Sequence, residues 1–122
     1  MTRTMRQQWL HGFLDACLLC LLAERRDYGR GLVERLIAVG FDEVPGGTLY
    51  PALLRLERQG LVRTEREAST SGPPRKYYEL TGAGHEAVRD RQRTWLDFRA
   101  AMDAVVTAPL PTGPRPSESG GP

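Results

Sequence analysis

Hydrophobic residues recur with helical spacing through the first forty positions of the chain. In residues 10–22, seven apolar side chains fall at i, i+3, i+4, i+7, i+8, i+11 and i+12, which is the stripe of a well-buried helix. A second amphipathic helix is expected over residues 28–39, with Gly40 as its C-terminal cap. The residues expected to face inward from this second helix are Leu32, Leu36 and Ile37.

The middle of the chain changes from a helical to an alternating pattern. A third helix is predicted over residues 47–59 and ends at Gly60. Residues 62–67 and 76–80 alternate between polar and apolar side chains and predict the two strands of a hairpin. Residues 68–74 are expected to form a mobile tip, because Ser, Gly and paired Pro interrupt a ladder. The apolar face of the third helix consists of Leu49, Ala52, Leu53 and Leu56.

The last predicted helix begins after Thr81, whose hydroxyl is a suitable N-cap. Its apolar residues repeat with heptad spacing, interrupted once by Arg91, and predict a seam against a second helix. An apolar row of this size is uncommon on the surface of a monomer, so a dimer is expected. The residues of this seam are Val88, Trp95, Phe98, Met102 and Val105.

The order of these elements predicts the fold class, which is mostly α with a small two-stranded β-wing. A helix followed directly by a two-stranded ribbon is the layout of a winged helix-turn-helix. Residues 1–80 are expected to form this DNA-binding domain, and residues 81–107 a C-terminal dimerisation helix. Residues 108–122 are rich in Pro, Gly and Ser without an apolar pattern, and are expected to be a disordered tail.

The composition limits the size of the core and the possible classes of protein, but it does not indicate a function. A chain of 122 residues with 40% hydrophobic content supports one modest core, so association would add useful burial. The net charge of +2 does not by itself indicate a nucleic-acid partner. No apolar run reaches 18 residues and residues 10–22 include Asp15, which argues against a membrane span or a signal peptide. A cytoplasmic protein is therefore expected.

The polar face of the third helix and the wing carry the candidate DNA contacts. Gly46 and Gly47 would allow a phosphate to approach the free N–H groups at the start of the helix. Arginine can reach a base edge or a phosphate, and hydroxyl groups suit phosphate oxygens. The alternative for the helix is that Arg55 and Arg58 are solvated charges, one of which pairs with a nearby glutamate. The alternative for the wing is an ordinary surface hairpin whose cations are balanced by Glu65, Glu67 and Glu79. The candidate contacts are Thr48, Tyr50, Pro51, Arg55 and Arg58 on the helix and Arg66, Arg75 and Lys76 on the wing.

Four blocks of the middle of the chain have a distinctive wording and spacing: Gly47-Thr48-Leu49-Tyr50-Pro51-Ala52-Leu53, Arg55-Leu56-Glu57, Gly60-Leu61-Val62 and Gly72-Pro73 with Arg75-Lys76-Tyr77-Tyr78. In these blocks, and over roughly residues 14–106, the chain resembles the PadR family of bacterial transcriptional regulators, in its short form with one C-terminal helix. This resemblance implies a two-fold dimer that binds an inverted-repeat operator in double-stranded DNA, as a repressor, and it favours Arg75 and Lys76 as contacts.

The resemblance also implies a regulatory site, because some members bind flat apolar effectors between subunits. The residues that would form such a pocket here are Trp9, Asp15, Trp95 and Phe98, although a tryptophan on a heptad seam also suits simple packing. The chain departs from the family at the start of the second helix, where it has Tyr28-Gly29-Arg30-Gly31. Gly31 is expected to weaken that helix by about 1 kcal/mol relative to alanine.

No constellation of an enzyme is present in the sequence, and neither a metal nor a cofactor is expected. Cys17 and Cys20 form a CxxC on one apolar helix face, which indicates packed thiols, with a redox sensor as the less favoured alternative. A metal site would need two further ligands, and His11 and His85 lie at no supporting spacing. A winged helix that binds protein without DNA is the other alternative.

Overall fold

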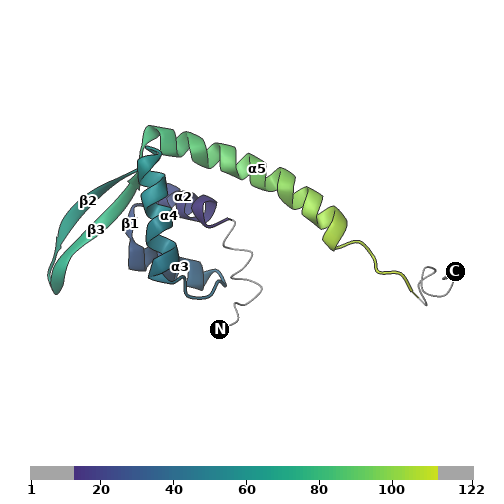
Figure 1. The fold of residues 1–122 in the computed structure, drawn as a ribbon, viewed down its shortest axis with the longest axis horizontal. Coiled ribbons are helices and arrows are strands. Elements are labelled where there is room, and N and C mark those ends of the chain that lie inside the picture. Colours follow the sequence, from purple (N-terminus) through teal and green to yellow (C-terminus); the bar gives the residue numbers. More distant parts are fainter. Residues whose placement is uncertain (1–12, 113–122) are drawn as a thin grey trace. The chain divides into compact units, whose positions relative to one another are not determined.

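The computed structural model describes residues 13–112, which belong to two compact units divided between Gln92 and Arg93. The first unit contains three helices, a sheet and the start of the last helix (Figure 1). In chain order the elements are α2 (Leu14–Glu24), β1 (Asp27–Tyr28), α3 (Gly29–Ala38), α4 (Gly46–Arg58), β2 (Val62–Ser69), β3 (Gly72–Leu80) and α5 (Gly82–Val106).

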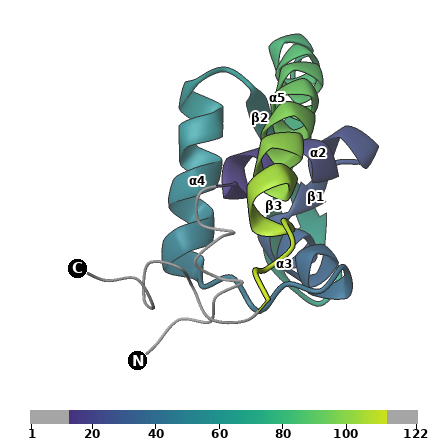
Figure 2. The ribbon, with the colours of Figure 1, turned by 90° about the vertical axis from the view of Figure 1, so that its right-hand side faces the viewer.

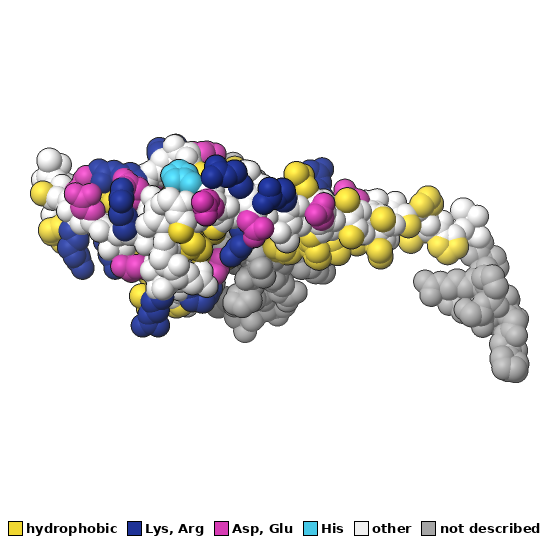
Figure 3. Space-filling view, turned by 90° about the horizontal axis from the view of Figure 1, so that it is seen from above, with side chains coloured by type: hydrophobic (Ala, Val, Ile, Leu, Met, Phe, Trp, Pro, Cys, Tyr) yellow, Lys and Arg dark blue, Asp and Glu magenta, His cyan; other side chains and the backbone are white. Residues whose placement is uncertain are grey.

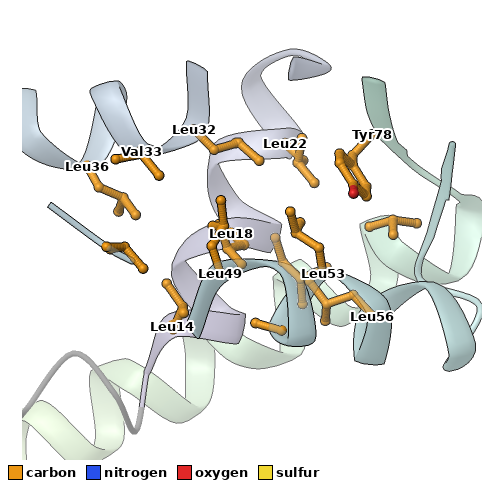
Figure 4. Close-up of a cluster of buried hydrophobic side chains, with 14 of the residues drawn as sticks. Leu14, Leu18, Leu22, Leu32, Val33, Leu36, Leu49, Leu53, Leu56 and Tyr78 are labelled. Carbon is orange, nitrogen blue, oxygen red and sulfur yellow. The ribbon is translucent and has the colours of Figure 1, made fainter. Parts of the chain in front are cut away.

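Leucines from α2, α3 and α4 form the centre of the core and meet Tyr78 of β3 (Figure 4). α4 lies against α2, as Figure 2 also shows, so the predicted stripe of α4 is fully buried. Ile37 was expected to face inward and this prediction is wrong, because its side chain is 39% exposed. Val33 is buried in its place, since the buried face of α3 is centred on Leu32, Val33 and Leu36.

The predicted helix ends are confirmed at three positions. Gly40 and Gly60 adopt φ values of +113° and +74°, a region that side chains other than glycine rarely enter. The hydroxyl of Thr81 accepts a hydrogen bond from the Gly84 N–H at 3.1 Å and caps α5. The same hydroxyl donates to the Gly60 carbonyl at 2.6 Å, which ties the start of α5 to the end of α4.

The sheet has three antiparallel strands in the order β1-β3-β2, so the expectation of two strands is wrong. The extra strand pairs Asp27 with Tyr78 and Tyr28 with Tyr77. The sequence pattern placed no strand here and assigned Tyr28 to the start of the second helix. Two residues are too few to show an alternating pattern, and only the pairing with β3 makes them a strand.

The hairpin is longer than predicted, because the ladder continues to the pair Ser69 and Gly72. The tip is therefore much shorter than the seven residues expected from the Ser, Gly and Pro content. Pro73 and Pro74 lie within β3, but β1 borders this strand only at Tyr77 and Tyr78. Successive N–H positions point to opposite sides of a strand, so one proline faces the side without a neighbour. The other faces β2 where the register shifts between Glu67 and Ser69, and the ladder is interrupted there.

A nearly buried ion pair joins β1 to α3. Asp27 Oδ2 accepts from Arg35 Nη1 at 3.3 Å, and Asp27 Oδ1 accepts from the Tyr28 N–H at 2.9 Å. Arg35 also donates to the Leu21 carbonyl at 2.8 Å. A Cβ added at Gly31 would overlap the Asp27 carboxylate, so this glycine makes room for the ion pair. The unusual glycine near the start of α3 thus has a structural reason.

Val88 of α5 is buried in the core of the first unit, with 7% of its surface exposed. The sequence placed this residue on the dimer seam, but its packing surface is already used within the chain. α5 continues through the second unit, where the other four predicted seam residues are exposed. Hydrophobic side chains follow this part of α5 in Figure 3, and the rings of Trp95 and Phe98 lie 6.3 Å apart.

Candidate nucleic-acid interface

The face of α4 opposite the core carries the residues that the sequence assigned to DNA. Tyr50, Pro51, Arg55 and Arg58 are exposed, and Thr48 is half-buried near the start of the helix. Pro51 lies beyond the first turn, so the Gly47 carbonyl loses its helical N–H partner. Gly47 is exposed and water can satisfy that carbonyl. The structure therefore confirms an outward face on α4, while its contact with DNA remains a prediction.

Arg55 forms an ion pair with Asp15 of α2, forty positions earlier in the chain. Its Nη2 donates to Asp15 Oδ1 at 2.9 Å and its Nε donates to Asp15 Oδ2 at 3.4 Å. The hydrogen bond to Asp15 raises the pKa of the Arg55 guanidinium above its ordinary value. The acidic partner is thus an aspartate of another helix, whereas the sequence suggested a nearby glutamate.

A groove of about 470 Å³ lies on the other flank of α4, between this helix and β3. Gly29, the first residue of α3, forms part of it, and a Cβ added there would lie 2.6 Å from the Tyr50 hydroxyl. Glycine at this position lets the exposed Tyr50 ring cross the start of α3. The groove is lined by Tyr28, Gly29, Tyr50, Leu54, Glu57, Arg75, Lys76 and Tyr78.

Two cations of β3 that the sequence assigned to DNA, Arg75 and Lys76, lie against aromatic rings at this groove. The Arg75 guanidinium lies 4.6 Å from the centroid of the Tyr28 ring, and Tyr28 meets Tyr77 edge to face at 5.6 Å. Lys76 Nζ lies 5.6 Å from the centroid of the buried Tyr78 ring and 4.0 Å from a Glu57 carboxylate oxygen. Sequence reasoning missed the role of Tyr28, because β1 brings it beside β3. Tyr78 is buried, whereas Tyr77 is only partly buried.

The acidic residues of the wing pair with cations other than the predicted DNA contacts. Arg26 forms ion pairs with Glu65 and Glu67, and Arg63 pairs with Glu79 across the hairpin. Among the residues that the structure describes, no ion pair joins a carboxylate to Arg58, Arg66 or Arg75. The alternative in which Glu65, Glu67 and Glu79 balance the predicted contacts is therefore not what the structure shows.

The thiols of α2 are partly buried against the core, as the sequence indicated. Burial raises the pKa of the Cys17 thiol, and the neighbouring Cys20 adds to the effect. Burial likewise raises the pKa of Cys20, with a further contribution from Glu24. A raised pKa lowers the fraction of reactive thiolate, which argues against a redox sensor. Within residues 13–112 no three potential ligands gather in a metal-binding group.

The effector residues proposed from the resemblance are not gathered by the structure. Trp9 lies outside the described residues. Asp15 is engaged with Arg55 in the first unit, and Trp95 and Phe98 lie on α5 in the second unit. The pocket therefore remains a prediction.

No helix in the described part of the chain is both long enough and apolar enough to cross a membrane.

The chain is similar to one curated protein in sequence and to two solved structures in fold. A regulator of Mycobacterium tuberculosis is 37% identical over 71 residues, which cover 58% of this chain and 64% of that protein. The crystal structure of a PadR-like transcriptional regulator from Bacillus cereus matches with a TM-score of 0.73 and 31% identity, over 84% of this chain and 99% of that one. A PadR-like transcription factor from Bacteroides fragilis matches with a TM-score of 0.68 and 33% identity, over 81% and 95%.

The family model of the PadR-like transcriptional regulators matches residues 18–90, more than half of the chain. This range includes α3, α4, the whole sheet and the groove between them. The family consists of transcriptional regulators and not of enzymes, in agreement with the prediction from the sequence. The chain belongs to the PadR-like family of transcriptional regulators.

Proposed function

We propose that the chain regulates transcription by binding double-stranded DNA, with α4 in the major groove and the wing on the adjacent backbone. The observation that carries this proposal is the arrangement of cations around α4. Arg55 and Arg58 project from its exposed face, and Arg75 and Lys76 border the groove on its flank. Arg26 and Arg63 pair with the acidic residues of the wing, so Arg66 and Arg75 remain without a carboxylate partner among the described residues and can attract phosphates.

Each proposed contact follows from its position. The exposed Gly46 and Gly47 leave room for a phosphate at the start of α4, where Thr48 and Tyr50 supply hydroxyl groups. Arg58 reaches a phosphate from the end of α4. Arg66 and Lys76 are cross-strand partners in the wing, so both cations fall at one level of the hairpin. Together with Arg75, they would follow the backbone beside the major groove.

The proposal includes a homodimer that binds an inverted-repeat operator. The exposed apolar residues on α5 beyond the first unit recur at helical spacing and suit a two-fold partner helix: Trp95, Phe98, Met102 and Val105. A dimer places two copies of α4 on successive turns of one DNA face. In this scheme residues 1–80 bind DNA, 81–107 associate, and 108–122 take no part.

Repression is the expected outcome, because a dimer on its operator blocks access to the promoter. A flat aromatic effector bound near Trp9, Asp15, Trp95 and Phe98 would release the DNA if it favoured a dimer with a different spacing of α4. Ligand and operator would then weaken each other reciprocally. Quenching of tryptophan fluorescence by a planar dye, reduced when operator is saturating, would support this control.

The DNA-facing surface can be tested with two matched variants in the wing. Lys76→Ala removes a proposed phosphate contact, and Arg63→Ala removes a cation that is bound to Glu79 on β3. We expect Lys76→Ala to weaken binding to any duplex and to reduce the salt slope by about one unit per chain. Arg63→Ala should leave the slope close to that of the parent. Equal slopes for both variants and the parent would place the interface elsewhere.

A further inference from the structure

The ion pair between Arg55 and Asp15 uses one particular edge of the guanidinium group. Asp15 accepts from Nε and from one hydrogen of Nη2, which together form the side edge. The five N–H groups of arginine are fixed in one plane, so the end edge keeps one hydrogen of Nη1 and the second hydrogen of Nη2. Among the described residues no group accepts from Nη1, and the Arg55 side chain is 56% exposed. The end edge is therefore available to a ligand.

Asp15 is well placed to hold this orientation. It lies in the first turn of α2, where the partial positive charge of the helix N-terminus stabilises a carboxylate. α2 packs against α4 in the core, so both ends of the ion pair are mounted on rigid elements. Fixing the long arginine side chain before DNA arrives lowers the entropy lost on binding.

The free end edge matches one base. Guanine presents two acceptors, O6 and N7, to the major groove, and arginine contacts both when it approaches end-on. A phosphate makes no comparable demand, because its oxygens accept from either edge of the guanidinium. An arginine whose side edge is already occupied is therefore better suited to guanine than to general attraction to the backbone.

We propose that Asp15 is a positioning residue that presents the end edge of Arg55 to a guanine in each operator half-site. This inference rests on the proposed function, because it requires α4 to enter the major groove. It gives Asp15 a role in sequence specificity in addition to its place in the predicted effector pocket. Arg58, one turn further along α4 and without an acidic partner in the described chain, would lack this discrimination.

The test is a selection of bound sequences from a pool of random duplexes by the full-length protein and its variants. The parent should enrich guanine at one position of each half-site, by about 5- to 150-fold over the other bases, the range for one good bidentate contact. Asp15→Asn keeps the shape of the side chain but loses its charge, and should reduce the preference at that position while the other positions stay selective. Arg55→Lys should reduce it at the same position, because lysine lacks the fork.

Arg58→Ala is the matched control and should lower affinity for all sequences without changing the preferred base. Thermal denaturation checks that each variant folds, and the half-exposed ion pair makes loss of the fold unexpected. Asp15→Glu keeps the negative charge and should retain part of the preference for guanine. This variant therefore separates a positioning role of the carboxylate from a purely structural role of the residue.

Several outcomes would overturn the inference. Guanine selection that depends on Arg55 and not on Asp15 would show that Arg55 reads the base without its partner. An increase in affinity for every sequence in Asp15→Asn would show that Asp15 competes with DNA instead of orienting Arg55. Sequence-specific binding by the parent without this guanine would refute the inference alone, whereas absence of DNA binding by the parent would refute the proposed function itself.

Discussion

The substitution Gly31→Ala is expected to change the stability of the fold in opposite directions, depending on whether helix propensity or side-chain packing decides. On helix propensity alone the change should stabilise α3 by about 1 kcal/mol, because glycine is a poor helix former. In the structure the new methyl group would overlap the carboxylate of Asp27. That carboxylate cannot withdraw without weakening its bonds to Arg35 and to the Tyr28 N–H.

The size of the effect follows from these contacts. Overfilling a packed site costs about 1–3 kcal/mol, and full loss of a buried ion pair costs about 3–5 kcal/mol. The side chains of Asp27 and Arg35 are only 12% and 13% exposed, so little water screens the loss. After the gain in propensity, we expect Gly31→Ala to reduce the free energy of unfolding by about 2 kcal/mol. This corresponds to a fall in Tm of about 8–16 °C for a domain of this size.

Thermal and urea denaturation followed by circular dichroism would measure this change. Gly82→Ala is the matched control, because its Cβ would meet no atom within 4 Å, and its Tm should be unchanged or higher. In a chain that already carries Asp27→Ala, the obstacle is absent and Gly31→Ala should become stabilising by up to about 1 kcal/mol. A higher Tm for Gly31→Ala in the parent chain would refute the reasoning.

Two further predictions concern α5 and the thiols. Val88→Ala should lower the free energy of unfolding by about 2 kcal/mol, because two buried methyl groups are lost and a cavity remains. Met102→Ala should instead weaken self-association, measured by light scattering, with little effect on the stability of the first unit, measured by denaturation. If Val88→Ala dissociated the dimer without lowering stability, Val88 would belong to the dimer seam and not to the core. Cys17 and Cys20 should react with iodoacetamide at pH 7.5 more slowly than the urea-unfolded chain, because their thiol pKa values are raised. Rapid alkylation of the native protein would reopen the redox alternative.

Much of the fold follows from local pattern in the sequence. The stripe of α4 was correctly predicted, because this helix buries one face and carries polar residues on the other. The stripe of α2 was predicted only in part, because Leu14, Leu18 and Leu22 are buried whereas Phe13 is exposed. Leu19, which the predicted stripe left out, is fully buried. The ends of helices at Gly40 and Gly60 followed from the positive φ that glycine permits. The outward residues of α4 were also predictable, because they are the complement of its buried stripe.

The features that the sequence did not reveal depend on long-range contacts. β1 is a strand only because β3 pairs with it, some fifty positions later. The ion pair of Arg55 with Asp15 joins residues forty positions apart, and a periodicity argument contains no such information. Val88 continues the heptad pattern of α5, yet it is buried by the first unit, since spacing alone does not state which surface an apolar side chain meets.

The most direct test of the account is the salt dependence of binding to the DNA immediately upstream of the gene. Fluorescence anisotropy with a labelled duplex, from about 50 to 200 mM salt, would give the slope of log K against log salt. With Arg58, Arg66, Arg75 and Lys76 on phosphates, we expect a slope of about −3 to −4 per bound chain. Binding with a slope near zero, or no binding to any duplex across this range, would contradict the proposal that α4 and the wing form a DNA-binding surface.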